Sequence, residues 1–238
     1  MKEVDVHKRG KLPLHLETSE MLAREIKAGI LLDGERLEPE RQMAKRLGIA
    51  VGTLRKSLAV LESNGMLERI QGSGNYIRHV DDDKTIYGFF RLELTQGGGL
   101  PKATTLAVDK VAGTDEINFA ENDTYYRIRR SRFLNDTEAA LEEIWLDASL
   151  VEKPIKQSEL SDSLYQYYKE VLGFWIARVE DSVSVSSVPE WKPATFCANA
   201  PDTFGFVTRY SWDQLGRQVE YSKTWFDTRT TRYVARWK

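Results

Sequence analysis

Two arginines, Arg130 and Arg132, have the residue type and spacing that most directly suggest chemistry. They lie in the stretch 125–134, where alternating apolar and charged residues predict a β-strand. Residues two apart on a strand face one side, so both guanidinium groups would point to one place and favour an anion. A second interpretation is a solvated strand face, in which Arg127, Arg129, Arg130 and Arg132 pair with Glu138, Glu142 and Glu143.

Histidine and cysteine are scarce. The three histidines are His7, His15 and His79, which removes His-based catalysis and His-rich metal sites from residues 80–238. Carboxylate chemistry stays open there, and we expect no cofactor. Cys197 is the only cysteine, so no internal disulfide can form and a reducing compartment is expected. Without a signal-peptide pattern or a long apolar run, the protein is expected to be soluble, cytoplasmic and without a membrane span.

The 238 residues, 41% of them hydrophobic, suffice for one large domain or two modest ones. The net charge of −2 points to no partner, but its distribution is uneven. Residues 1–80 carry 14 Lys and Arg against 11 Asp and Glu, whereas the rest carries 20 against 25. A mildly basic first part fits a nucleic-acid-binding module attached to something else.

The first 80 residues predict a winged helix-turn-helix. Apolar residues recur at helical spacing in three stretches, which are marked by Leu22, Ile26 and Ile30, by residues 40–47, and by Leu54, Leu58 and Leu61. The last two stretches are joined by residues 48–52, a tight turn with two glycines. Residues 66–70 and 75–78, separated by a glycine-rich tip, then read as a β-hairpin.

Residues 14–77 resemble the DNA-binding domain of the GntR family of bacterial regulators. The matching residues are Pro13-Leu14, Ile26, Gly29, Gly34, Leu37, Glu40-Arg41, Met43-Ala44, Leu47-Gly48-Ile49, Thr53-Leu54-Arg55, Leu58, Leu61, Gly65, Leu67, Arg69, Gly72, Gly74 and Tyr76-Ile77. Two departures affect operator choice. Ala50-Val51 stand where the family usually has Ser-Arg, and Glu38-Pro39 where it usually has Pro-Ser.

The resemblance implies DNA contacts at Arg41, Thr53, Arg55, Lys56 and Gly72. Arginine can bridge two acceptors of guanine or clamp a phosphate, and threonine at a helix start can bond a phosphate. A glycine at the wing tip lets the main chain approach DNA closely. In the competing interpretation Arg41 pairs with Glu38 or Glu40, and Arg55 and Lys56 form an ordinary solvated helix face.

We place a charged linker at residues 80–84, between a DNA-binding domain at 1–79 and a second domain at 85–238. The second domain is expected to be α+β with an antiparallel sheet. Its expected elements are strands at 86–94, 125–134, 139–146 and 174–188, a final hairpin at 204–212 and 218–226, and one helix. That helix is expected to be capped by Ser161-Asp162, to turn Leu164, Tyr168, Val171 and Leu172 to one face, and to end at Gly173.

This order resembles the UTRA effector domain of HutC-type GntR regulators, an antiparallel-sheet fold shared with chorismate lyase. The markers are Arg130-x-Arg132, Glu142, Ser163-Leu164-Tyr165, Gly173 and Gly216-x-x-Val219-Glu220-Tyr221-Ser222. The resemblance implies that Arg130, Arg132, Ser163 and Tyr165 bind the anionic group of an effector, while Glu142 and Glu220 meet its hydroxyl or amino groups. Alternatively, Tyr165 packs in the core. Phe226 stands where binders of sugar phosphates often have tyrosine, so amino-acid-related compounds and organic acids stay open.

We therefore expect a DNA-binding transcription regulator, most often a repressor, whose operator binding responds to a small anionic metabolite. It should be a homodimer through residues 85–238 and select a palindromic operator. Two alternatives are a constitutive DNA-binding protein whose second domain only dimerises, and a lyase-like enzyme that also binds DNA.

Overall fold

The computed structural model describes residues 12–28, 30–78, 87–121, 123–196 and 203–236. Within these ranges the chain forms two compact units, one of residues 12–100 with 233–236 and the other of residues 101–232. His7, His79, Cys197 and the expected linker 80–84 lie outside the described residues. None of the helices in the described ranges is long and apolar enough to cross a membrane.

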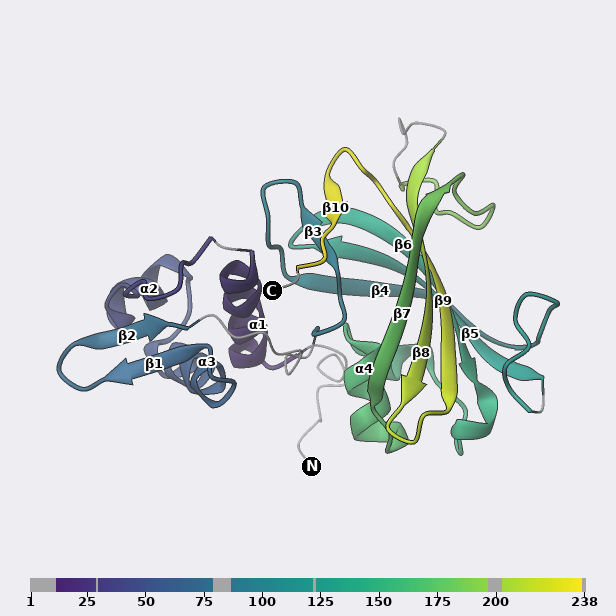
Figure 1. Ribbon diagram of the computed structural model, residues 1–238, viewed down its shortest axis with the longest axis horizontal. Coiled ribbons are helices and arrows are strands. Elements are labelled where there is room, and N and C mark those ends of the chain that lie inside the picture. The colour runs from purple at the N-terminus through teal and green to yellow at the C-terminus, as the bar shows by residue number, and fades with distance from the viewer. Residues whose placement is uncertain (1–11, 29, 79–86, 122, 197–202, 237–238) are drawn as a thin grey trace, which may run out of the picture. The chain divides into compact units, whose positions relative to one another are not determined.

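The first unit contains the expected winged helix-turn-helix (Figure 1). Its elements are α1 (Leu14–Lys27), α2 (Glu40–Arg46), α3 (Val51–Ser63), and the antiparallel wing of β1 (Leu67–Ile70) and β2 (Gly74–Ile77). The apolar faces of the helices meet in one core that includes Leu22, Ile26, Leu54, Leu58 and Leu61. Ile30 is an exception to the expected pattern, because α1 ends at Lys27 and the Ile30 side chain is 49% exposed.

In the same unit the described residues of the segment 87–100 are fastened to α1 by Arg24. The Arg24 side chain is buried, and its guanidinium donates to the carbonyl oxygens of Gly99 at 2.7 Å, Phe90 at 3.4 Å and Leu92. Strand β3 (Leu92–Leu94) is much shorter than the strand expected over 86–94, because residues 87–89 form a turn. Arg236 donates to both carboxylate oxygens of Glu93, at 2.6 and 3.0 Å.

The second unit is built on a six-stranded antiparallel sheet with the strand order β4-β5-β6-β9-β8-β7 (Figure 1). The strands are β4 (Pro101–Ala112), β5 (Thr124–Leu134), β6 (Thr137–Asp147), β7 (Ile176–Ser186), β8 (Phe204–Asp213) and β9 (Gln218–Phe226); a short β10 (Thr231–Tyr233) follows. Asn135 lies in the tight turn between β5 and β6 with a φ of 55°. The edge strand β4 was not predicted, because its small and polar residues lack a strong apolar alternation.

The expected helix after residue 161 is shorter and less regular than predicted. Only α4 (Leu164–Tyr167) is α-helical, and a π-helical turn (Tyr168–Leu172) follows and ends at Gly173. The wider turn changes the helical period, which leaves Val171 62% exposed instead of buried. The cap is Ser163, whose Oγ accepts from the Gln166 amide at 3.3 Å, and not Ser161-Asp162. Two 3₁₀ turns precede α4, at Ala148–Leu150 and Gln157–Glu159.

Replacing Arg24 with alanine should destabilise the first unit, because three carbonyl oxygens would lose a buried charged donor. We expect the free energy of unfolding to fall by about 3 kcal/mol, and amides around residues 90–99 to exchange faster in hydrogen-exchange measurements. Arg46→Ala is the matched control. It removes an exposed ion pair to Glu38 and a weaker electrostatic interaction with Glu25, and should change stability by less than about 1 kcal/mol. Unchanged exchange at 90–99 in Arg24→Ala would show that Arg24 does not fasten this segment.

Candidate functional site

The exposed side of α3 and the start of α2 bring together the residues expected to touch DNA. Arg41, Arg55 and Lys56 are exposed and Thr53 is half-buried, whereas Leu54 and Leu58 on the same helix face the core. The Nε of Arg55 lies 2.7 Å from a carboxylate oxygen of Glu40. Glu38 bonds Arg46 instead of Arg41, so the proposed pairing of Arg41 with Glu38 or Glu40 is wrong.

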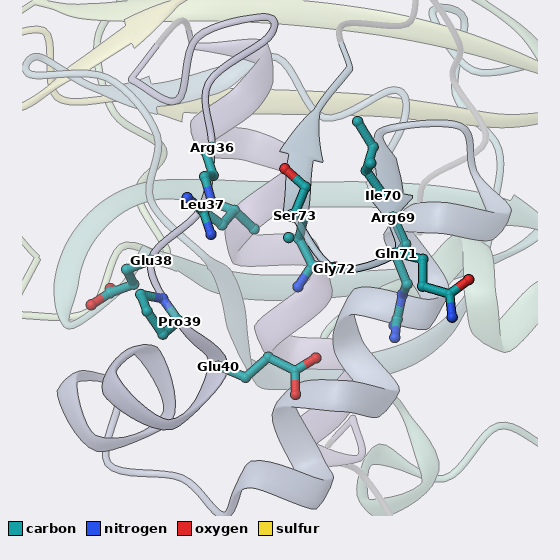
Figure 2. Close-up of a pocket in the computed structure, with 12 residues that line it drawn as sticks. Arg36, Leu37, Glu38, Pro39, Glu40, Arg69, Ile70, Gln71, Gly72 and Ser73 are labelled. Carbon is teal, nitrogen blue, oxygen red and sulfur yellow. The ribbon is translucent and has the colours of Figure 1, made fainter.

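The wing forms one wall of a pocket of about 450 Å³ next to this surface. Residues 36–40 and 69–75 line it, and Figure 2 shows Arg36 from the segment before α2, Glu40 from α2, and Arg69 from the wing around the turn at Gly72 and Ser73. Gly72 has a φ of +75°, and no atom lies within 4 Å of the place where its Cβ would be. The wing tip is therefore open enough for a close approach by another main chain or by DNA.

The two departures in sequence have visible local consequences. Ala50 stands at the N-cap of α3 and Pro39 at that of α2, and neither makes a side-chain capping bond. Val51 begins α3 and packs partly buried against the helical core. At this turn the chain therefore offers an apolar side chain for packing, and any cation for DNA must come from elsewhere on the domain.

In the second unit Arg130 and Arg132 form a buried pair. They are 1% and 3% exposed, which rules out a solvated strand face for these two arginines. Both guanidinium groups donate to the carbonyl oxygen of Asp162, at 2.6 Å from Arg130 and 2.9 Å from Arg132. Glu142 faces Arg130 in the β5–β6 register, and its Oε2 lies 3.8 Å from the Arg130 Nε and 3.9 Å from the Arg132 Nη1.

The other arginines of β5 follow the alternative interpretation in part, since both lie within 4 Å of Glu143 but Arg127 is closer to Asp109, which was not predicted. Arg127 and Arg129 point to the opposite side of the strand, where Arg129 donates to Glu143 at 2.9 Å and Arg127 to Asp109 at 3.2 Å. The alternation of the strand therefore separates a buried pair from a half-buried, ion-paired face.

A second buried polar group surrounds Glu220, which is 2% exposed. Its carboxylate accepts from Tyr165 at 3.1 Å, from Tyr168 at 2.6 Å and from Ser211 at 3.0 Å. Burial raises the pKa of Glu220, and the three hydrogen bonds oppose that rise only in part. Burial and the nearby Glu220 carboxylate raise the pKa values of Tyr165 and Tyr168, so both phenols stay protonated donors.

The structure thus gathers the expected effector residues into two neighbouring clusters. Arg130, Arg132 and Glu142 form one, and Tyr165 and Glu220 form the other, while Ser163 caps the helix that carries Tyr165. Electrostatic interactions of Glu142 with Glu220 and of Arg130 with Tyr168 connect them. Because α4 has four residues, the expected contribution of a helix dipole to anion binding is small.

Sequence reasoning missed several members of the second cluster. Ser211 and Arg209 lie two residues apart on β8 and so share a face. Arg209 forms a double ion pair with Asp181, at 2.6 and 2.7 Å, and also bonds Tyr165. The spacing of the two residues on β8 was the available signal, but only the fold places them beside Tyr165. Among the described residues no group of His, Cys, Asp and Glu is arranged to hold a metal ion.

Comparisons with known proteins match both halves of the chain. The profile of the "Bacterial regulatory proteins, gntR family" matches residues 14–77, and that of the UTRA domain matches residues 102–232. The chain is similar to the HTH-type transcriptional regulator SmoD of Agrobacterium fabrum, with 50% identity over 97% of this chain and 98% of SmoD. It is also similar to the HTH-type transcriptional repressor NagR of Bacillus subtilis, with 22% identity over 93% of each chain.

A solved structure supports the fold. The possible transcriptional regulator YydK from Bacillus subtilis superposes with a TM-score of 0.54 at 18% identity, over 95% of this chain and all of that one. At this identity the likeness concerns the fold alone.

Glu220 should make stability depend on pH. Its pKa is raised in the folded state, so its contribution to stability is present below the ordinary carboxyl pKa and is lost as pH rises through the raised value. Glutamine does not ionise, so Glu220→Gln should not show this loss. Above about pH 4 the unfolding free energy of the variant should therefore rise relative to that of wild type. Urea unfolding at a series of pH values measures this difference. A constant difference across the series would contradict the raised pKa.

Proposed function

The chain belongs to the GntR family of bacterial regulatory proteins and carries a UTRA domain, and on this basis we propose that it is a repressor released from its operator by a small anionic metabolite. Its family makes it a DNA-binding transcription regulator with an effector-binding domain. Relatives along nearly its whole length are named as regulators and repressors, so it is a regulator and not a lyase-like enzyme. The observation that carries the proposed effector class is the buried pair Arg130 and Arg132.

On the DNA side we assign contacts to Arg41, Thr53, Arg55, Lys56 and Gly72. What supports them is their common exposed position on α2, α3 and the wing tip. The ion pair between Arg55 and Glu40 does not argue against this role. An exposed pair contributes only about 0–1 kcal/mol, so a DNA phosphate or base can take the place of the carboxylate.

On the effector side we assign the anionic group to Arg130, Arg132, Ser163 and Tyr165, and the polar far end to Glu142 and Glu220. The guanidinium pair favours a planar or tetrahedral oxyanion such as a carboxylate or a phosphate. Glu142 and Glu220 are carboxyl groups that can accept hydrogen bonds from hydroxyl or amino groups. A sugar phosphate, an amino-acid-related compound and an organic acid all carry this combination.

We also propose a homodimer that forms through residues 85–238 and reads a palindromic operator, with the domain boundary at 80–84. The 11-residue edge strand β7 supports this, because Val183 and Val185 on it are exposed. A two-fold dimer would place two winged helices on half-sites about one helical turn apart. Light scattering of the free protein at micromolar concentration measures its mass directly.

Replacing Arg55 with alanine should weaken binding to an operator fragment by about 1–3 kcal/mol, because the recognition helix loses a guanidinium fork. Gel-shift titration on a duplex that the wild-type protein selects from a random pool measures this effect. The matched control is Arg46→Ala, which breaks the neighbouring pair to Glu38 and should leave affinity unchanged. Equal affinities for wild type and Arg55→Ala would show that Arg55 does not contact the operator.

Arg132→Met should abolish stabilisation by the effector. In a thermal-shift screen of sugar phosphates, amino acids and organic acids, an anionic compound at 100 times its Kd should raise the wild-type Tm by about 5–10 °C. The matched control Arg129→Met changes an arginine on the opposite side of β5 and should keep the shift. An equal shift in Arg132→Met and wild type would place the effector elsewhere.

A further inference from the structure

Some arginines of the winged helix form ion pairs with acidic side chains and others do not. Four are engaged with glutamates, in the pairs Arg46–Glu38, Arg55–Glu40, Arg69–Glu62 and Arg78–Glu68. Arg24 is committed to the carbonyl oxygens of the 90–99 segment. Within the described residues Arg36 and Arg41 have no acidic partner. Arg41 belongs to the DNA contacts already assigned, whereas Arg36 has no assigned role.

The backbone at Arg36 is held firmly against the wing. Arg36 forms a β-bridge with Tyr76, and the bonds from the Leu37 amide to Asn75 and from the Ile77 amide to Glu35 are both 2.9 Å long. Although its side chain is exposed, the backbone of Arg36 is therefore part of the wing and moves with it.

The guanidinium of Arg36 lies over Gly74. A Cβ built at Gly74 would come within 2.9 Å of the Arg36 Nε and 3.5 Å of its Nη2. The missing side chain at Gly74 thus leaves the space in which the Arg36 head group rests, at the end of β2 next to the wing tip and on the pocket side (Figure 2).

The pocket connects Arg36 to the surface assigned to DNA. Gly72 at the wing tip and Glu40 both line it, and Glu40 bonds Arg55 of α3. The two glutamates of the pocket, Glu38 and Glu40, are each matched by an arginine, so their charge does little to offset that of Arg36. A concave surface beside the wing tip therefore presents a cation that no carboxylate has neutralised.

We propose that Arg36 binds a backbone phosphate of duplex DNA beside the wing, as a contact additional to those of α2, α3 and the wing tip. The inference rests on the proposed DNA-binding surface. A phosphate is the partner that the position favours, because Arg36 lies beside the wing on the segment before α2 and not on the recognition helix α3. Phosphate contacts fix the register of a protein on DNA and carry no sequence information themselves.

The test compares the dependence of DNA affinity on salt in full-length variants. The probes are a duplex that the wild-type protein selects from a random pool and a duplex of random sequence, titrated from about 50 to 300 mM KCl. Arg36→Ala should lose about fivefold in affinity on both duplexes, and the slope of log K against log salt should fall by about one. Arg36→Lys should keep the slope, because lysine serves a phosphate as a point charge. The control Arg78→Ala removes an arginine that follows β2 at the end of the wing away from the tip, where it pairs with Glu68, and should match wild type.

Three results overturn the inference. If Arg36→Ala keeps the wild-type slope of log K against log salt, Arg36 makes no phosphate contact, although the domain still binds DNA. If Arg36→Ala loses affinity only for the selected duplex, with the slope unchanged, and Arg36→Lys does not restore that affinity, Arg36 contacts bases instead of a phosphate. A wild-type protein that bound neither duplex would overturn the proposed function, and this inference with it.

Discussion

Two guanidinium groups buried in the sheet of the second unit need acceptors, and this requirement organises the residues around them. A buried cation is costly unless it is hydrogen-bonded and compensated. Arg130 and Arg132 meet the requirement through the Asp162 carbonyl oxygen and the Glu142 carboxylate. The bonds to Asp162 hold the main chain immediately before the Ser163 cap, and so they fix where α4 begins.

The position of α4 in turn decides what Glu220 meets. Tyr165 and Tyr168 project from α4 and the turn after it to the Glu220 carboxylate, and Ser211 reaches the same group from β8. A ligand that competed for the arginines would thus act on a chain of bonds that reaches β8 and β9. The Arg55–Glu40 pair of the winged helix is different in kind, because the exposed Arg55 can exchange the glutamate for a phosphate at little cost.

The sequence predicted the winged helix closely, since Leu54, Leu58 and Leu61 and the glycines of the wing report local geometry. It also predicted that Arg130 and Arg132 share a side of a strand, because the period of a strand requires it. Glu142 was among the pairing partners that the second interpretation named, but the main-chain acceptor could not be predicted, since Asp162 lies 30 residues from Arg132 and contributes a carbonyl oxygen. Likewise, the π-helical turn that exposes Val171 carries no signature in composition, and only the fold shows that the Arg36 head group rests against Gly74.

We expect the effector-binding domain and the DNA-binding domain to be energetically coupled. The most direct test measures the affinity of the protein for its selected duplex with and without a saturating amount of the compound that stabilises it most, and the affinity for that compound with and without the duplex. If the domains are coupled, the compound and the duplex weaken each other's binding by the same factor, about 5- to 150-fold. If the compound bound but the duplex affinity stayed the same, the protein would be a constitutive DNA-binding protein and the claim would be wrong.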